Sequence, residues 1–453
     1  MITLLTLISY VLVASSQVLH LKPGKVQGFE HTTKNGTLAE VFLNIPYASP
    51  PVGQLRFEKP TPPVPWNNTR DGTKFGASCL PIIPEAALPP GQPSEDCLTL
   101  NIIRPKKEAP PSGFPILFWV HGGAFEVGSA SLHGYKGFAD IYIPSDIIVV
   151  TIQYRLGVYG FLSTGDSHIP GNLGLFDMAE ALKFIHTNAE NIGGDRSRIT
   201  VWGHSAGSAA AGQLILSPVT RGVMKARPFF QRFFVNPADY PNWNRERLVN
   251  LLKKVVKKMH IGDHLEELLR DIVSYYVDRD EKQEHEFYID RYTEFFSDLL
   301  FIVPSADGIF ARRAAGWDMY AYVLDHYNEA IWNITVPKRL RGAPHGAEAQ
   351  YTKGTTNLKK LDFNNEEQVV ADVFRQSFIE FVKTGVPSNK HVSWLNVGTD
   401  KDLRYLQITP KPLMRLGFYN ETTSFWHKTL KYGFNVVQLL PTEKSVKRDK
   451  LQL

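Results

Sequence analysis

Three short apolar runs, each bounded by turn residues, stand out in the first half of the chain. They are rich in β-branched or aromatic residues and do not alternate with polar ones. They lie at 115–120, 147–154 and 199–203. Continuous apolar runs of this length are typical of parallel strands buried on both faces. Apolar residues recur at helical spacing over 175–188, between the second and third runs. This succession of strand, helix and strand predicts an α/β fold with a doubly wound sheet.

The second half of the chain continues the pattern with more helix. A stretch of small residues at 206–216 predicts a helix that can lie close to a sheet, and 245–276 is expected to be helical, with a basic run at its start. A further strand is expected at 320–324, followed by an amphipathic helix at 366–383. No internal repeat or linker separates these elements, so we expect one large domain.

The composition supports a folded chain and excludes several classes of protein. Of 453 residues, 43% are hydrophobic and 21% are charged, which is the balance of a globular protein with a sizeable core. The net charge of +5 comes from scattered basic residues, which is too weak a signal for nucleic-acid binding.

The N-terminus reads as a secretory signal peptide. The chain is mostly apolar from residue 2 to 13 and small residues follow at 14–16, a run that is too short to span a bilayer. We therefore expect a signal peptide at 1–16, a folded domain at 17–453, and a protein that is secreted or held in the lumen of the secretory pathway.

In the oxidising secretory pathway, a disulfide and N-glycosylation are both expected. The chain has two cysteines, Cys79 and Cys97, and one intrachain disulfide is favoured over two free thiols. Sequons that fit a glycosylated surface occur at Asn35, Asn67, Asn333 and Asn420.

The strongest chemical motif is Gly203-His204-Ser205-Ala206-Gly207, which matches G-x-S-x-G. It directly follows the strand expected at 199–203 and opens the small-residue helix. The flanking glycines let the backbone turn sharply, so Ser205 is expected in a strained turn with its hydroxyl exposed. The alternative is a glycine-rich turn with an inert serine.

A second glycine motif follows the strand expected at 115–120, where His121 and Gly122 precede Gly123 and Ala124. The backbone N–H groups of Gly123 and Ala124, with that of Ala206, could receive the charge that develops on a carbonyl oxygen during acyl transfer. An ordinary glycine turn is the alternative here.

Together these motifs resemble the type-B carboxylesterase and cholinesterase family. Further segments that carry the resemblance are IPYA at 45–48, PPVG at 50–53, EDCLTLN at 95–101, GNLGLFD at 171–177 and GGD at 193–195. The match runs from about Gly24 to Lys225 and resumes at about Asn236. The resemblance implies an α/β-hydrolase fold with a central, mostly parallel sheet, and it implies the disulfide between Cys79 and Cys97. It also implies hydrolysis of small carboxylic esters through an acyl-enzyme on Ser205, with no cofactor.

His345, in the segment PHGAE at 344–348, matches the catalytic histidine of that family. In that role its imidazole would take the proton from Ser205 and return it to the leaving alcohol. A surface histidine in a loop is the alternative. No pair of Cys or His residues has ligand spacing that also looks structural, so a metal site is not indicated.

The acid of the triad is missing from this sequence. In the family it is a Glu between the serine and the histidine, but Ser205 and His345 are only 140 positions apart, roughly a hundred fewer than is usual. The shortening falls between about Ala226 and Asn236, where no Glu precedes a Gly. Asp239 and Glu246 are the nearest carboxylates and could substitute, although Asp239 reads more simply as a turn residue or helix cap.

The missing segment would also have carried the strand beside 199–203. Residues Phe229–Val235 form a plausible replacement strand; without one, an unpaired apolar edge would invite aggregation. The sequence therefore predicts a serine ester hydrolase impaired by loss of its acid. The alternative from another class is a non-catalytic binding or adhesion protein of the same fold, which would act through a partner protein.

Overall fold

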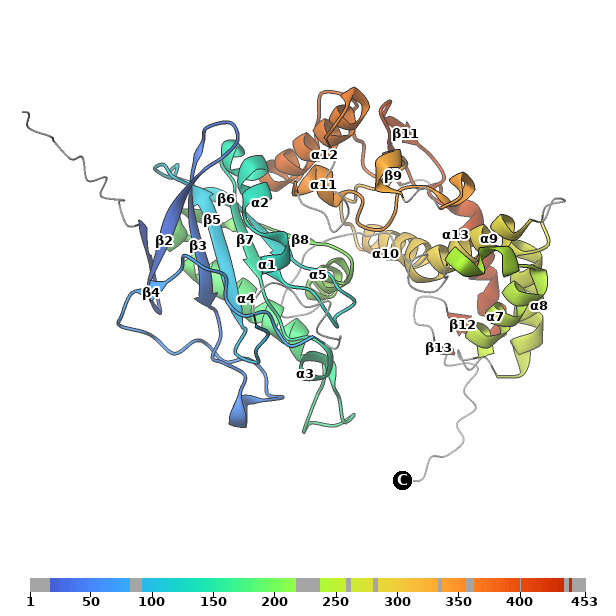
Figure 1. The fold of residues 1–453 in the computed structure, drawn as a ribbon, viewed down its shortest axis with the longest axis horizontal. Coiled ribbons are helices and arrows are strands. Elements are labelled where there is room, and N and C mark those ends of the chain that lie inside the picture. Colours follow the sequence, from blue (N-terminus) through green and yellow to red (C-terminus); the bar gives the residue numbers. More distant parts are fainter. Residues whose placement is uncertain are drawn as a thin grey trace, which may run out of the picture. The chain divides into compact units, whose positions relative to one another are not determined.

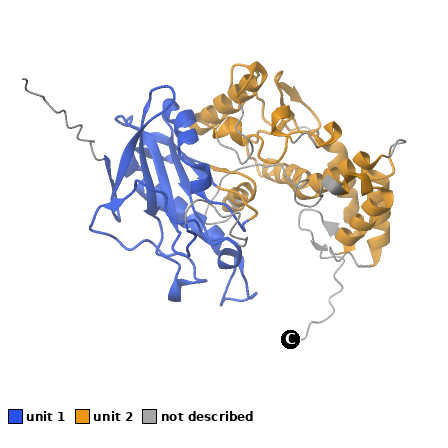
Figure 2. Ribbon diagram, in the orientation of Figure 1, with its two compact units in different colours: residues 1–120, 125–200 blue, residues 121–124, 201–453 orange. Residues whose placement is uncertain are grey.

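The computed structural model describes most of the chain (Figure 1). The described residues are 17–81, 92–216, 237–257, 262–279, 284–332, 336–354, 362–399, 401–435 and 440–441. The chain divides into two compact units, residues 1–120 with 125–200 and residues 121–124 with 201–453 (Figure 2). The expected signal peptide at 1–16 and the possible strand Phe229–Val235 lie outside the described residues.

The first unit is built on an eight-stranded sheet whose last strand, β8, ends in the second unit. The strands are β1 Gln17–Leu21, β2 Gly24–Thr32, β3 Leu38–Pro46, β4 Arg70–Asp71, β5 Thr99–Pro105, β6 Phe114–Val120, β7 Ile148–Ile152 and β8 Gly194–Gly203. Their order is β1-β2-β3-β5-β7-β6-β8, with β4 on β2. β6 and β7 pair in parallel, as their apolar runs predicted, and all their residues are buried. The pairs that run from β1 to β7 are antiparallel, so the sheet is mixed.

Four helices accompany this sheet (Figure 1). They are α1 Ala130–His133, α2 Lys136–Tyr142, α3 Gly157–Phe161 and α4 Leu173–Asn188. The expected helix at 175–188 is α4, and its residues Met178 and Ile185 are fully buried. Inside the unit, Asp177 of α4 accepts two hydrogen bonds from the guanidinium of Arg155, at 2.8 and 2.9 Å. This buried ion pair fixes the segment after β7 against α4, because breaking it would leave an uncompensated buried charge.

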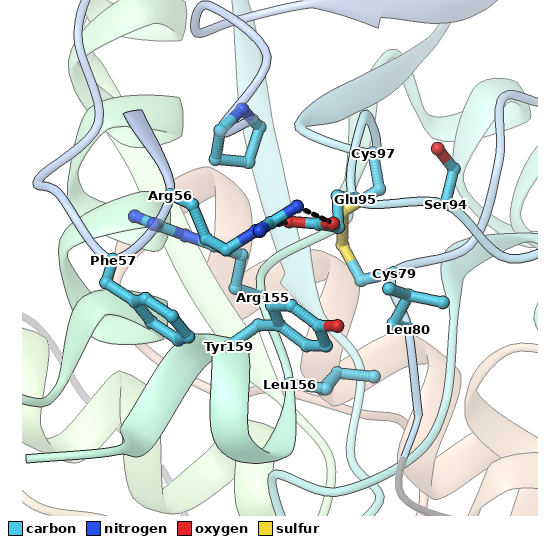
Figure 3. A pocket seen from close by; sticks show the side chains of 11 residues that line it. Arg56, Phe57, Cys79, Leu80, Ser94, Glu95, Cys97, Arg155, Leu156 and Tyr159 are labelled. Atoms are coloured by element: carbon cyan, nitrogen blue, oxygen red, sulfur yellow. Dashed lines mark hydrogen bonds and ion pairs between the residues drawn. A yellow bond between two sulfur atoms is a disulfide. The ribbon is translucent and has the colours of Figure 1, made fainter. Parts of the chain in front are cut away.

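The predicted disulfide between Cys79 and Cys97 is confirmed. It borders a small hollow in the first unit, where Arg56 donates two hydrogen bonds of 2.6 Å to Glu95 (Figure 3). Tyr159 also lines the hollow and stacks on Phe57 at 6.0 Å between ring centroids. The lining contains no histidine beside its serine, so this hollow has the parts of a structural clamp and lacks those of an acyl-transfer site.

The second unit is mainly helical. Among the described residues its helices are α5 Ala206–Leu216, α7 Arg245–Lys257, α8 Leu265–Tyr276, α9 His285–Ser297, α10 Val303–Ala314, α11 Ala349–Thr352, α12 Asn365–Thr384 and α13 Asn420–Lys428. The expected helices at 206–216 and 366–383 are confirmed as α5 and α12. The helix expected over 245–276 is present as two helices, α7 and α8, and Gly262 begins a short 3₁₀ turn before α8.

The helical core of this unit follows from amphipathic spacing. Leu248, Leu252 and Val256 recur along one face of α7 and are fully buried, and they belong to one apolar cluster with Leu268 and Ile272 of α8. A π-helical turn, Asp298–Ile302, joins α9 to α10. Within the part of the chain described, no helix combines the length and apolar character that a membrane span requires.

Two small sheets complete the unit. One has the order β11-β10-β9 and is formed by β9 Tyr322–Leu324, β10 Tyr405–Ile408 and β11 Leu413–Arg415. The other pairs β12 Phe434–Asn435 with β13 Leu440–Pro441. The described residues between α5 and β9 contain no strand, which agrees with the expected loss of a strand after this helix.

Candidate functional site

Ser205 lies at a sharp turn between the end of β8 and the start of α5. Its φ is +56°, a left-handed conformation that costs a non-glycine residue energy. The turn needs Gly203, because a Cβ there would overlap the carbonyl of Gly207. The expectation of a strained turn at Ser205 is therefore confirmed.

The loop after β6 approaches this turn within the second unit. A Cβ added to Gly122 would lie 2.5 Å from the carbonyl oxygen of His204 and 2.8 Å from the Cβ of Ser205. Gly123 and Ala124, which follow, have φ of +120° and +56°. Glycine at 122 thus lets the backbone of this loop lie directly against the serine.

A third N–H group in this region comes from α5. Ala206 is the first residue of that helix, so its N–H has no acceptor within the helix and lies at the positive end of the helix dipole. Gly207 and Ser208 donate to the carbonyls of His204 and Ser205, at 2.9 Å each. Candidate donors to an oxyanion, at Gly123, Ala124 and Ala206, are thus carried by the two segments that meet at Ser205.

His345 lies in the loop between β9 and α11 and is brought to the same turn. Its ring stacks on His204, the residue before Ser205, with 5.2 Å between ring centroids and 20° between planes. Phe301 contacts it from the π-helical turn at 5.8 Å. The structure thus brings His345 against the residue that precedes Ser205, although His345 and Ser205 are 140 positions apart in sequence.

A pocket adjoins this histidine. Phe301, Pro344 and Glu348 line it, together with residues of β9. Its wall is mostly aromatic and aliphatic, and Glu348 supplies one carboxyl group. Such a lining suits an apolar organic molecule with few polar groups.

The Nδ1 atom of His345 is buried and has no hydrogen-bond partner among the described residues. Burial lowers the pKa of His345 from 6.5 to about 4, so the ring is neutral at pH 7. In a serine triad this nitrogen donates to the carboxylate that holds the ring. The atom that the acid would bind is therefore present and unpartnered in the part of the chain described.

The two candidate substitute acids have other surroundings. Asp239 lies in a 3₁₀ turn, Pro237–Asn242, and its carboxylate is 3.3 Å from the guanidinium of Arg247. Glu246 is exposed in the first turn of α7. Whether either reaches the histidine in solution stays a prediction.

Sequence reasoning missed three residues beside His345. The Nε2 of His204 is buried without a hydrogen-bond partner in the described chain and lies 3.9 Å from the Oε1 of Glu348. Burial raises the pKa of Glu348, and it lowers the pKa of the fully buried Lys353 to about 7, where the nearby Glu348 partly opposes the shift. Closeness in sequence to the two motif residues could have indicated two of them. His204 is the variable residue of the serine motif, and Glu348 lies three positions after His345.

The sequons differ in their surroundings. Asn35 and Asn67 are exposed. The side-chain nitrogen of Asn420, by contrast, donates a 2.6 Å hydrogen bond to Asp402. Asn333 lies outside the described residues. Glycosylation at these sites stays a prediction.

Comparison with known proteins gives a consistent result. The model of the carboxylesterase family matches residues 15–232 and 228–426. Gut esterase 1 of Caenorhabditis elegans is 31% identical over 540 positions, covering 93% of this chain and 94% of the relative. The pyrethroid hydrolase Ces2a of Mus musculus is 27% identical over 526 positions, covering 92% of each chain.

These alignments also bear on the shortening. The alignment with gut esterase 1 has 540 positions, but 93% of this 453-residue chain is only about 420 residues. More than a hundred positions are therefore filled by the relative alone. The family match breaks into two segments that meet at 228–232, inside the interval from Ala226 to Asn236 where the shortening is expected.

The close packing at Gly203 makes it a test of the turn. Replacing Gly203 with Ala should displace the start of α5, because the new Cβ cannot avoid the backbone of Gly207. We expect reaction of Ser205 with an organophosphate to slow at least tenfold, since a displaced hydroxyl loses its alignment. Gly342→Ala is the matched control, because a Cβ there meets nothing within 4 Å. Equal labelling rates for the two variants, measured on folded protein, would contradict the described packing.

Proposed function

The chain belongs to the carboxylesterase family, and on this premise we propose that it is a serine ester hydrolase with Ser205 as nucleophile and His345 as general base. One observation carries the proposal. Ser205 is held in a left-handed turn at a helix start, and the ring of His345 stacks on the residue beside it. A strained serine with a neutral imidazole nearby is the arrangement that acyl transfer requires.

The reaction divides into two half-reactions. His345 takes the proton of the Ser205 hydroxyl while the oxygen attacks the ester carbonyl, and the N–H groups of Gly123, Ala124 and Ala206 receive the charge on the carbonyl oxygen. The proton then passes to the alcohol as it leaves, and the acyl group stays on Ser205. In the second half-reaction, water gives a proton to His345 as its oxygen attacks the acyl carbon. The bond between the acyl group and Ser205 Oγ then breaks, the proton passes from His345 to that oxygen, and the acid leaves. These steps consume only ester and water, and need no cofactor.

The unpartnered Nδ1 of His345 supports a slow version of this reaction. Without a carboxylate, the ring is less well oriented and the imidazolium that forms during attack is not compensated. The oxyanion donors do not depend on the acid, so part of the rate enhancement is retained. A wholly non-catalytic binding role remains the outcome to be expected if Ser205 proves unreactive.

Substrate and location follow from the same premise. The names of the relatives, gut esterase and pyrethroid hydrolase, support a small organic ester as substrate, and the apolar pocket beside His345 suits one. The disulfide between Cys79 and Cys97 supports folding in an oxidising compartment, so we propose a secreted or luminal protein. This includes the expected signal peptide at 1–16 and glycosylation of the sequons.

Labelling with a fluorophosphonate probe tests the nucleophile directly. We expect covalent attachment to Ser205 in the full-length secreted protein, because only an activated serine reacts with such a probe. Ser205→Ala should abolish labelling, and Ser208→Ala, in the first turn of α5, should retain it. Labelling that persists in Ser205→Ala would contradict the assignment.

The missing acid predicts the rate. Loss of the triad carboxylate lowers kcat by about 10⁴ in a serine protease, so we expect turnover of a simple aryl ester about three to four orders of magnitude below that of gut esterase 1 assayed in parallel. Asp239→Asn and Glu246→Gln should leave this rate unchanged unless one of them serves as the acid. Equal turnover by this chain and the relative would show that the triad is complete in solution.

Burial of His345 predicts the pH dependence. The base is active when neutral, and its pKa is lowered to about 4, so kcat/KM should stay constant down to about pH 5 and fall as the pH drops through 4. A carboxylate on Nδ1 would stabilise the imidazolium and move this fall to higher pH. Circular dichroism at each pH separates titration from unfolding. A half-maximal rate near pH 6.5 would contradict a buried, unpaired histidine.

A further inference from the structure

His345 is held by rings where a triad histidine would be held by a carboxylate. Its Nδ1 has no hydrogen-bond partner in the described residues, so nothing there fixes the ring by that atom. Its contacts are the stacked ring of His204 at 5.2 Å and the tilted ring of Phe301 at 5.8 Å. Of these two, His204 lies nearly parallel to it, at 20°. That ring therefore restricts rotation of the histidine.

His204 is itself closely confined. Its side chain is only 20% exposed, and a Cβ on Gly346 would lie 2.9 Å from its Nε2. Gly346 has φ of +80°, so a glycine is favoured there for both conformation and space. The ring thus lies over the backbone that follows His345, and the two histidines confine each other.

Glu348 is the third member of this cluster, which consists of His204, His345 and Glu348. Its Oε1 is 3.9 Å from the Nε2 of His204, which is too long for a direct hydrogen bond but within reach of a small rotation. Its backbone is fixed, because its carbonyl accepts from the N–H groups of Tyr351 and Thr352, at 3.0 Å each. Burial lowers the pKa of His204 far below its usual value, so this ring is neutral, and burial raises the pKa of Glu348.

We propose that His204 and Glu348 together position His345 for catalysis, in place of the missing acid. This rests on the proposed function of Ser205 and His345. When His345 takes the serine proton, a positive charge forms on a ring stacked on His204. Glu348, whose Oε1 lies 3.9 Å from the Nε2 of His204, would offset part of that charge in its carboxylate form. The positioning moves no proton other than the one that Ser205 loses.

Other ionisable groups face this cluster. Lys353, at the end of α11, acts on both Glu348 and His204, and it also acts on His121 of the loop after β6. When it is protonated, Lys353 favours the carboxylate form of Glu348. It also disfavours a second positive charge on His204, which keeps that ring neutral as a stacking partner.

The test separates kcat from KM on an aryl ester, using the full-length protein. Glu348→Gln and His204→Asn should each lower kcat, by up to about a hundredfold, because a small misplacement of the base slows proton transfer. KM should stay within about twofold, because neither residue is proposed to bind substrate. The double variant should lose no more than the worse single variant, because both residues act through one ring.

Glu366→Gln is the matched control, since Glu366 is exposed in the first turn of α12. Thermal unfolding of each variant shows whether it folds, and if Glu348→Gln does not, Glu348→Asp should keep more kcat than His204→Asn. An unchanged kcat in both single variants would overturn the positioning role while leaving Ser205 as nucleophile. Independent, additive losses would also overturn it. A wild-type Ser205 that resists the fluorophosphonate would overturn the proposed function and this inference with it.

Discussion

The left-handed backbone of Ser205 is the constraint on which the site depends. A serine holds this conformation only where the surrounding chain leaves it no other, and here that chain is nearly free of side chains. Gly203 admits the backbone of Gly207, and Gly122 admits the carbonyl of His204. Gly203 and Gly122 therefore have the same role in two segments of the chain, because each lets backbone approach backbone at the turn that carries Ser205. The strain is stored where the chemistry is proposed to occur.

The same close packing explains why the protonation of His345 depends on the groups around it. A histidine brought against a buried turn loses water, and loss of water disfavours the charged form that it must adopt during catalysis. In a complete triad the carboxylate offsets that cost. Here the described surroundings are aromatic rings and a carboxyl group that burial also pushes toward neutrality. His345 is thus held against the residue beside Ser205, but little in the described structure stabilises its protonated form.

Features with a local cause could be predicted from the sequence, and contacts between residues far apart in the chain could not. The turn at Ser205 and helix α5 were predictable because their cause is local, in glycine spacing and small residues. The strands β6 and β7 were predictable from their apolar runs. The break between α7 and α8 was missed, since amphipathic spacing continues on both sides of Gly262. The contact between His204 and Glu348 was also missed, because no local pattern brings a residue beside the serine against one that lies 144 positions later.

A shortened chain can keep a serine and a histidine together because different elements carry them. The serine depends on β8 and α5, and the histidine on the loop between β9 and α11, which is anchored by the packing of Tyr351 against Phe374 of α12. We propose that the triad acid is lost with the segment that this chain lacks. Such a loss removes one partner and leaves the supports of the other two in place. A deletion that had removed β9 or α12 would instead have released the histidine. The position of the deletion thus favours a weakened catalyst over a disassembled site.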